Sequence, residues 1–303
     1  MATQPVCILG GTGFVGRHIT RLLCANGTEV RLPTRSTDKA QQALAALPVE
    51  AIAADVHDPA QLKELFAGAG AIINLVGILH EQGGQTFRQA HIELARKVVE
   101  AAKAAGVNRL LHMSALNASA DGPSNYLRSK GEAEKLVQAS GLQATIFRPS
   151  VIFGAEDTFL NMFAKLAKWA PVMPLACANA KFQPVWVENV AQAFVHSLDD
   201  PASIGQRYNL CGPQVYRLRE LVSFAAACCD RHPLIVPLPN TIAYAQASVM
   251  EWLPVKLMTR DNFNSMRQDN VCDCAFPFGI KPARMEDIAP RYLCASKNVQ
   301  PES

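Results

Sequence analysis

Three glycines at a fixed spacing, Gly10, Gly13 and Gly16, constrain the fold of this chain more than any other feature. The apolar run Val6–Leu9 comes directly before them and predicts a buried strand. Residues Arg17–Asn26 carry apolar side chains at helical spacing and predict a helix. A strand, a glycine-rich turn and a helix in this order predict the first unit of a parallel sheet covered by helices.

The same alternation of strands and helices continues to about residue 148. Further strands are predicted over residues 29–34, 51–54, 71–76, 109–113 and 144–148, and helices over 41–47, 59–66, 86–105 and 129–139. This pattern indicates an α/β fold, a doubly wound parallel Rossmann sheet. Later elements are shorter and richer in proline and aromatic residues. We therefore predict a Rossmann domain over 1–152, a smaller mixed lobe over 153–297 from which about 183–198 returns to the main sheet, and a frayed tail over 298–303.

Charge and hydropathy exclude two classes of protein. A net charge of +3 without a clustered basic stripe does not suit a nucleic-acid-binding protein. No apolar run reaches the roughly 18 residues that span a bilayer, so we predict no transmembrane segment. Residues Leu234–Leu257 are apolar and aromatic with few charges, and they are either part of the core of the second lobe or a surface that docks on a membrane.

The cysteines indicate a reducing compartment. There are nine, an odd number, and we expect no secretory leader. We expect free thiols and a cytoplasmic location, with attachment to the inner membrane as an alternative. Cys272 and Cys274 form the one pair spaced for a metal, but no second pair stands at a suitable distance, so we predict no metal site.

The glycine turn has the features of a phosphate cradle. Gly10 permits the tight turn, Gly13 lets the backbone approach a pyrophosphate, and Gly16 lets the helix pack closely. The helix that follows presents its free N–H groups to the anion, so the turn predicts a dinucleotide site. The alternative is a glycine-rich turn without a ligand. The residues predicted to contact the cofactor are Gly10, Thr12, Gly13, Phe14, Val15, Gly16, Arg35, Asp55, Val56, Asn74, Leu75, Val76, Gly77, Lys130, Pro149 and Val151.

The end of the second strand favours NADP(H) over NAD(H). An acidic residue at this position binds the ribose 2′-hydroxyl of NAD and repels a 2′-phosphate. This chain has no acid there and has Arg35, whose guanidinium suits a phosphate. In the alternative, Arg35 is a solvated loop cation. Asp55 and Val56 are expected at the adenine edge, and Asn74–Gly77 at the nicotinamide ribose.

Ser114, Tyr126 and Lys130 form the predicted catalytic group. Tyr126 and Lys130 are four residues apart and share one face of a helix. A nearby cation is expected to lower the pKa of the phenol, which suits proton transfer to or from an oxygen during hydride transfer. Ser114 ends a strand and would hold the same oxygen. The alternative is a surface pair without a catalytic role.

With these residues in this order, the chain resembles a short-chain dehydrogenase/reductase of the extended or atypical kind. Such proteins belong to the epimerase/dehydratase superfamily. A closer resemblance, to the group of the 39 kDa accessory subunit of respiratory complex I and its bacterial relatives, is carried by residues 73–77, 112–118, 126–130, 147–157, 159–161, 183–187 and 259–261. That group implies tight NADP(H) binding, a structural or assembly role, and links to ubiquinone biosynthesis.

Two functional hypotheses follow. The first is an NADP(H)-dependent oxidoreductase acting on a carbonyl, a hydroxyl or a quinone-related apolar substrate. The second is a non-catalytic accessory protein that NADP(H) stabilises and that docks on a respiratory, membrane-associated complex. The first hypothesis needs an apolar pocket for the substrate. Its candidate lining residues, which could instead pack in an ordinary core, are Phe159, Met162, Phe163, Trp169 and Trp186.

Some polar residues carry weaker expectations. Four histidines stand apart in the sequence and are expected to be ordinary packed or exposed side chains: His80, His91, His112 and His196. Arg148 ends a strand and either faces a substrate or pairs with a carboxylate.

Overall fold

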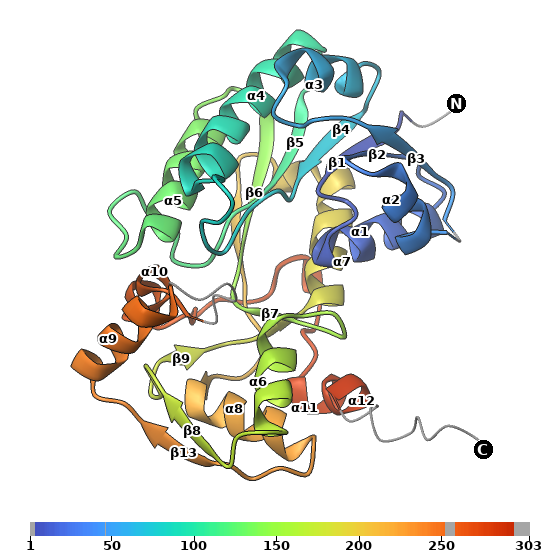
Figure 1. The fold of residues 1–303 in the computed structure, drawn as a ribbon. Helices are drawn as coiled ribbons and strands as arrows, with labels where there is room; N and C mark the ends of the chain where they lie inside the picture. Colours follow the sequence, from blue (N-terminus) through green and yellow to red (C-terminus); the bar gives the residue numbers. More distant parts are fainter. Residues whose placement is uncertain (1–3, 46, 252–257, 294–303) are drawn as a thin grey trace. The chain divides into compact units, whose positions relative to one another are not determined.

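The sheet expected from the alternating pattern is present and has seven strands. In the computed structural model, which describes residues 4–45, 47–251 and 258–293, all neighbouring strands of this sheet are parallel. Their order is β11-β6-β5-β4-β1-β2-β3 (Figure 1). Their bounds are β1 Val6–Leu9, β2 Val30–Thr34, β3 Val49–Ala53, β4 Ala71–Asn74, β5 Arg109–Met113, β6 Gln143–Pro149 and β11 Arg207–Leu210. The chain winds outward in both directions from β1 and β4, so the doubly wound Rossmann fold is confirmed.

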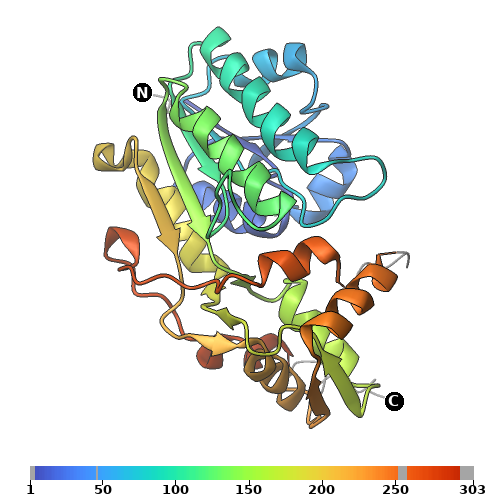
Figure 2. The ribbon, with the colours of Figure 1, turned by 90° about the vertical axis from the view of Figure 1, so that its left-hand side faces the viewer.

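The seventh strand, β11, is not predicted by the sequence pattern. It pairs with β6 from Arg207 opposite Ile146 to Leu210 opposite Pro149, and Figure 2 shows the yellow β11 beside the green β6. Of its residues only Leu210 is fully buried. A short edge strand of this kind has little hydrophobic alternation to detect.

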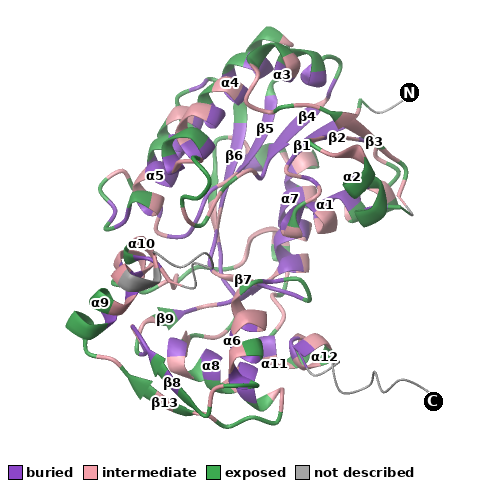
Figure 3. Cartoon of the chain, viewed as in Figure 1, coloured by how far each residue is buried: buried purple, intermediate pink, exposed green. Residues whose placement is uncertain are grey.

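The helices of this unit cover both faces of the sheet (Figure 1). Their bounds are α1 Phe14–Ala25, α2 Thr37–Ala43, α3 Pro59–Phe66, the π-helical segment η1 Arg88–Glu93, α4 Leu94–Ala104, α5 Asn125–Gln138, α7 Val187–Asp199, and the short 3₁₀ turns η2 Pro201–Ser203 and η3 Pro277–Gly279. Helices α3, α4 and α5 pack one continuous apolar core with β1, β4, β5 and β6. On α7, Glu188 accepts hydrogen bonds from Arg21 (2.6 Å) and pairs with His18 (2.7 Å) on α1. Figure 3 shows the buried strands between partly exposed helices.

Two helices begin about one turn earlier than the sequence predicts, because serines cap them. The Ser36 hydroxyl accepts from the Lys39 N–H at the start of α2, and the Ser124 hydroxyl accepts from the Leu127 N–H (3.1 Å) at the start of α5. A capping hydroxyl satisfies an N–H that the helix leaves without a partner. Tyr126 and Lys130 therefore both lie on α5.

The glycine turn is as tight as its spacing implies. Gly10 has a φ of +80°, which glycine adopts without strain. A Cβ on Gly16 would lie 2.3 Å from the Gly10 carbonyl oxygen, and one on Gly11 would lie 2.2 Å from Leu32. Gly16 thus lets α1 approach the turn itself, while Gly11 makes room for β2.

A second compact unit comprises residues 150–187, 211–276 and 281–293 of the described chain. Its elements are β7 Ile152–Phe153, α6 Phe159–Ala167, β8 Val172–Leu175, β9 Lys181–Phe182, β10 Val185–Trp186, β12 Tyr216–Arg217, α8 Leu218–Ala227, β13 Leu234–Pro237, α9 Asn240–Met250, α10 Arg260–Ser265, α11 Met285–Ile288 and α12 Pro290–Leu293. Helices α6, α8, α11 and α12 enclose its apolar core. In this unit β8 pairs in parallel with β13, and β7 with β10.

The apolar segment Leu234–Leu257 forms β13 and α9, and its residues 252–257 lie outside the described part of the chain. Leu234, Ile242 and Tyr244 are exposed. Among the described helices, none is both long and apolar enough to cross a membrane.

The packing at Gly16 predicts a stability effect. Gly16→Ala would force a Cβ into the Gly10 backbone, so we expect it to lower the free energy of unfolding by about 1–3 kcal/mol. Urea unfolding followed by circular dichroism measures this. Gly13→Ala is the matched control, because its Cβ would meet nothing closer than 3.2 Å. Equal losses for both variants would contradict this account of the turn.

Candidate functional site

The start of α1 presents backbone donors without a side-chain cap. Gly13 is its N-cap, no side chain accepts from the first turn, and that turn contains no acidic residue. Thr12 and Phe14 are half-buried and Val15 is buried, while Gly13 is exposed. Free N–H groups and the positive end of the helix dipole make this a place for a phosphate.

An open groove of about 730 Å³ lies beside the ends of β2 and β3. It is lined by Arg35, Ala54, Asp55, His57, Gly83, Gly84, Gln85, Gln89, Glu93 and Lys97. Three of its charged side chains are already engaged. Asp55 accepts from the His57 N–H (2.9 Å), and Lys97 donates to the His57 carbonyl (2.6 Å). Glu93 pairs with Arg88 outside the groove (3.2 Å).

Arg35 is the exposed guanidinium that lines this groove. In the described part of the chain it forms no ion pair or hydrogen bond. Val56, which the sequence places at the adenine edge, is half-buried and packs against the core on the α3–α5 face of the sheet.

The segment after β4 is held from within the unit. Asn74 is buried, accepts from the Val76 N–H (3.2 Å), and lies 3.4 Å from His112 Nδ1. Leu75 donates its N–H to the Leu9 carbonyl (3.0 Å), which joins the ends of β1 and β4. Gly77 lies against Lys130, since a Cβ there would be 3.0 Å from Nζ. A side chain at position 77 would therefore displace the ammonium.

Lys130 is the central charged group of the site. Its side chain is only 4% exposed, and Nζ donates to the Met113 carbonyl (3.1 Å) at the end of β5. Burial lowers the pKa of Lys130 to about 8, although Glu134 acts in the opposite direction. Glu134 is itself held by two hydrogen bonds from Arg148, one of them 2.8 Å long. Of the two alternatives for Arg148, the structure shows pairing with a carboxylate.

Ser114 follows Met113 and has an unused hydroxyl. Its backbone N–H donates to the Phe147 carbonyl (2.7 Å), whereas its buried Oγ has no hydrogen-bond partner among the described residues. A buried polar atom without a partner carries a cost that a ligand would remove. Ser114 Oγ is therefore a candidate contact for a ligand oxygen.

Tyr126 differs from the sequence prediction in one respect. We expected Lys130 to lower the pKa of the phenol, but burial raises it to about 12. The prediction was wrong because removing the phenolate from water outweighs the effect of a lysine whose ammonium binds Met113. The phenol is therefore neutral near pH 7 and able to donate a proton.

Two histidines that the sequence gave no reason to choose lie beside this group. The His91 ring packs edge-on against Tyr126, with 5.7 Å between ring centroids, and parallel to Phe87. Its Nε2 accepts from the Ile78 N–H (3.1 Å), so its Nδ1 carries the proton and donates to Ser129 Oγ (2.8 Å). Ser129 donates in turn to the Tyr126 carbonyl (2.8 Å). This chain of hydrogen bonds fixes the first turn of α5.

His112 is the second buried histidine. Its Nε2 has no partner among the described residues. Burial and the charge of Lys130 lower the pKa of His112 to about 3. Burial and Lys130 also lower the pKa of His91 to about 2, with a smaller contribution from His112. The sequence does not predict that His91 and His112 lie close together, because they are 21 residues apart. The π-helical turn that carries His91 has no sequence signature.

The remaining predicted residues lie as follows. Pro149 is buried, and its carbonyl accepts from the Leu116 N–H (2.9 Å). Val151 belongs to the second unit, where its N–H donates to Asn270 (3.2 Å). Phe159, Met162, Phe163 and Trp186 pack in or against the core of that unit, whereas Trp169 is 88% exposed. The exposed position of Trp169 excludes it from that core.

The neutral state of His112 predicts a pH dependence of stability. Its folded pKa lies below its unfolded value near 6.5, so the unfolded state binds a proton first and stability falls as pH drops below 6.5. Between pH 7 and pH 5 this histidine contributes a loss of about 2 kcal/mol. His112→Gln should reduce the pH-dependent loss by that amount in urea unfolding at the two pH values. The same loss in both proteins would mean that His112 takes up a proton in the folded state.

Comparisons with known proteins agree with this geometry. Residues 10–165 match the NAD(P)H-binding family, and residues 119–217 match the 3-beta hydroxysteroid dehydrogenase/isomerase family. The chain is 33% identical to the mitochondrial NADH dehydrogenase [ubiquinone] 1 alpha subcomplex subunit 9 of Arabidopsis thaliana over 94% of its length and 76% of the plant protein. It is 31% identical to a ceramide reductase of Caulobacter vibrioides, covering 83% of this chain and 80% of the reductase.

A solved structure shares the fold. The NADPH-dependent quinone oxidoreductase of Escherichia coli, in complex with NADPH, superposes with a TM-score of 0.77 at 20% identity, over 95% of this chain and 99% of the other. The start of α1, which has no side-chain cap, fits a dinucleotide site. The chain belongs to the NAD(P)H-binding family of the epimerase/dehydratase-like superfamily, in the group of the alpha subcomplex subunit 9 of NADH dehydrogenase [ubiquinone].

Proposed function

We propose that this protein is an NADP(H)-dependent oxidoreductase that acts on a carbonyl, a hydroxyl or a quinone-related group of an apolar substrate. The observation that carries the proposal is the buried, unpartnered Ser114 hydroxyl next to Met113, whose carbonyl holds the ammonium of Lys130. Tyr126 lies one helical turn before Lys130 on α5. Such a group is suited to bind and protonate one oxygen atom.

Each side chain has a separate task in the proposed reaction. When bound, NADPH supplies the hydride that reduces the substrate carbon. Ser114 donates a hydrogen bond to the substrate oxygen, and Tyr126 gives that oxygen its phenolic proton. Lys130 stabilises the negative charge that the phenol then carries, and its own pKa of about 8 keeps it mostly charged at pH 7. The products are an alcohol or a hydroquinone and NADP⁺.

The cofactor preference rests on the groove at the end of β2. The cradle residues Gly10–Gly16 would hold the pyrophosphate, and Arg35 would bind the 2′-phosphate of NADP(H). Of the carboxylates that line the groove, Asp55 follows β3 and Glu93 pairs with Arg88, and neither stands at the end of β2, where an acid would bind the ribose 2′-hydroxyl of NAD. These contacts favour NADP(H) over NAD(H).

A second function has its own support. Relatives at 33% identity are named as subunits of NADH dehydrogenase [ubiquinone], and the second unit exposes Trp169, Leu234 and Ile242. In this alternative NADP(H) stabilises the fold, and the protein is an accessory or assembly component peripheral to an inner membrane. The two functions differ in whether Tyr126 is needed for turnover.

Arg35→Ala tests the cofactor preference. Loss of a charged hydrogen bond, about 1.5–3 kcal/mol, should raise the Kd for NADPH by about 10- to 150-fold and leave the Kd for NADH nearly unchanged. Isothermal titration calorimetry measures both constants. Lys39→Ala is the matched control, because Lys39 is exposed on α2 and does not line the groove. Tighter binding of NADH than of NADPH by the unaltered protein would refute the preference.

Tyr126→Phe tests the catalytic proposal. Removing only the hydroxyl should lower kcat for reduction of quinones or apolar ketones by at least about 100-fold while NADPH affinity changes less than about threefold. Initial rates and NADPH fluorescence titrations give the two values. Phe87→Leu, a change in a ring that packs on Tyr126, serves as the control for altered packing. Unchanged turnover in Tyr126→Phe would remove this phenol from the mechanism.

A further inference from the structure

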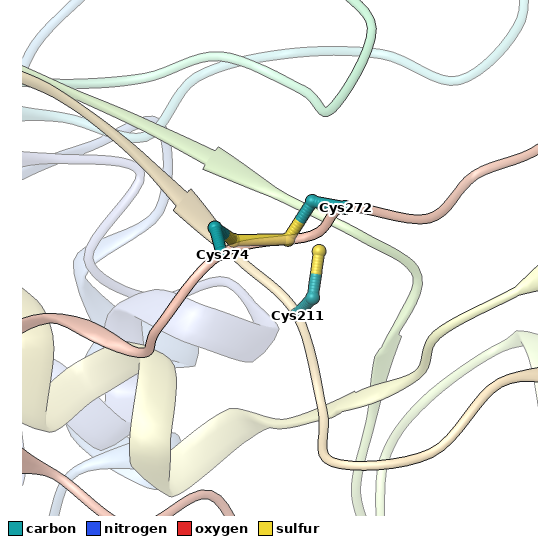
Figure 4. Close-up of side chains that lie close together, drawn as sticks. All are labelled: Cys211, Cys272 and Cys274. Atoms are coloured by element: carbon teal, nitrogen blue, oxygen red, sulfur yellow. A yellow bond between two sulfur atoms is a disulfide. The ribbon is translucent and has the colours of Figure 1, made fainter.

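Three cysteines from distant parts of the sequence meet in the second unit. The sulfur atoms of Cys211, Cys272 and Cys274 all lie within 4.8 Å of one another (Figure 4). Cys272 and Cys274 are joined by a disulfide, so the expectation of free thiols was wrong for these two residues, whereas Cys211 is a free thiol. Cys211 is buried, Cys272 is half-buried and Cys274 is exposed. The cluster therefore reaches from the interior of the unit to its surface.

The backbone around the cluster is fixed by contacts that do not involve sulfur. The Gln183 side chain bridges the two segments: its Nε2 donates to the Gly212 carbonyl (2.8 Å), and its Oε1 accepts from the Cys272 N–H (2.9 Å). The Gly212 N–H donates to the Gln183 carbonyl (3.1 Å). A Cβ on Gly212 would lie 1.8 Å from the Pro184 carbonyl oxygen, so the segments that contain Gly212 and Pro184 are in direct contact.

Asn270 anchors the segment that leads to Cys272. It exchanges backbone hydrogen bonds with Lys181 (2.7 Å) and Gln183 (3.1 Å), and its Oδ1 accepts from Ser150 (2.5 Å). None of these bonds involves a sulfur atom, so reduction of the disulfide breaks none of them directly. The three sulfurs are thus held close together by the fold and not by the disulfide alone.

We propose that, once the Cys272–Cys274 disulfide is reduced, Cys211, Cys272 and Cys274 bind one thiophilic d¹⁰ metal ion of the Zn(II) or Cu(I) class. Zn–S bonds of about 2.3 Å place thiolates about 4 Å apart, a spacing that this cluster reaches with small side-chain rotations. Thiolates select soft ions over Mg²⁺ or Ca²⁺. A dithiol supplies the two electrons and two protons that open the disulfide, and each thiol releases its proton when it binds the metal.

The described part of the chain offers no fourth His, Cys, Asp or Glu ligand. A Zn(II) ion would therefore keep one position for water or an external ligand, whereas Cu(I) is satisfied by three thiolates. This inference is independent of the proposed oxidoreductase function. It also departs from the sequence prediction of no metal site, which considered Cys272 and Cys274 without Cys211.

The test uses the full chain, reduced with a phosphine and desalted without oxygen. Zn(II) is titrated against a chromophoric chelator and Cu(I) against bathocuproine disulfonate, and these two arms identify the preferred ion. We expect one ion per chain, and an affinity at least about 100-fold lower in Cys211→Ser and in Cys274→Ser. Cys24→Ser is the matched control, since Cys24 is a half-buried free thiol outside the cluster. It should bind like the unaltered protein.

Gln183→Ala adds a variant that keeps all three thiols. Loss of the bridge between the segments should weaken metal binding by about 10- to 100-fold, the usual effect of removing a group that positions a ligand. Circular dichroism checks that each variant is folded. Equal affinities in the unaltered protein, Cys211→Ser and Cys274→Ser, or the absence of stoichiometric binding by the reduced protein, would overturn the proposal. Metal binding by the oxidised protein with the same affinity as by the reduced protein would also overturn the proposal.

Discussion

The buried ammonium of Lys130 is the constraint on which the arrangement of the site depends. A charge removed from water is costly unless polar groups surround it, and here the Met113 carbonyl and, one turn further along α5, Glu134 offset that cost. The ammonium also affects the residues around it. A Cβ at position 77 would lie 3.0 Å from the ammonium, and two nearby histidines stay neutral because they are buried and because the charge of Lys130 opposes a second positive charge.

The parallel sheet explains why these groups meet. Strands β1, β4 and β5 are adjacent, so the glycine turn, the Asn74–Gly77 segment and Ser114 all leave the sheet at its carboxyl edge. Ligands of doubly wound sheets bind at this edge. Helix α5 returns along the same edge and brings Tyr126 and Lys130 beside it. Tyr126 is half-buried on this helix, and its phenol is neutral near pH 7.

Much of this could be predicted from the sequence, because the decisive features are local. The glycine spacing, the strand ends and the four-residue step from Tyr126 to Lys130 are all short-range patterns. The structure adds what depends on three dimensions. The half-exposed strand β11 carries little hydrophobic alternation, and the bond between Arg148 and Glu134 joins a strand to a helix. The direction of the Tyr126 pKa shift follows from burial, which spacing alone does not reveal.

The same limit applies to the polar residues that the sequence left unassigned. His91 and His112 meet Lys130 because η1, β5 and α5 converge, and Cys211 meets Cys272 because their segments are joined by contacts that include the Gln183 bridge. Neither group has a motif. Both are recognised from buried polar atoms and sulfur atoms whose neighbours come from distant segments.

Nucleotide exchange tests the central claim, that the dinucleotide site is a catalytic one, most directly. Freshly purified protein is mixed with isotopically labelled NADPH, and the bound nucleotide is identified and followed by mass spectrometry. An oxidoreductase has to release its oxidised cofactor in every cycle, so we predict that NADP(H) is the bound species and that it is replaced within seconds to minutes. Bound nucleotide that resists exchange for hours would contradict this account and favour a cofactor that serves only to stabilise the fold.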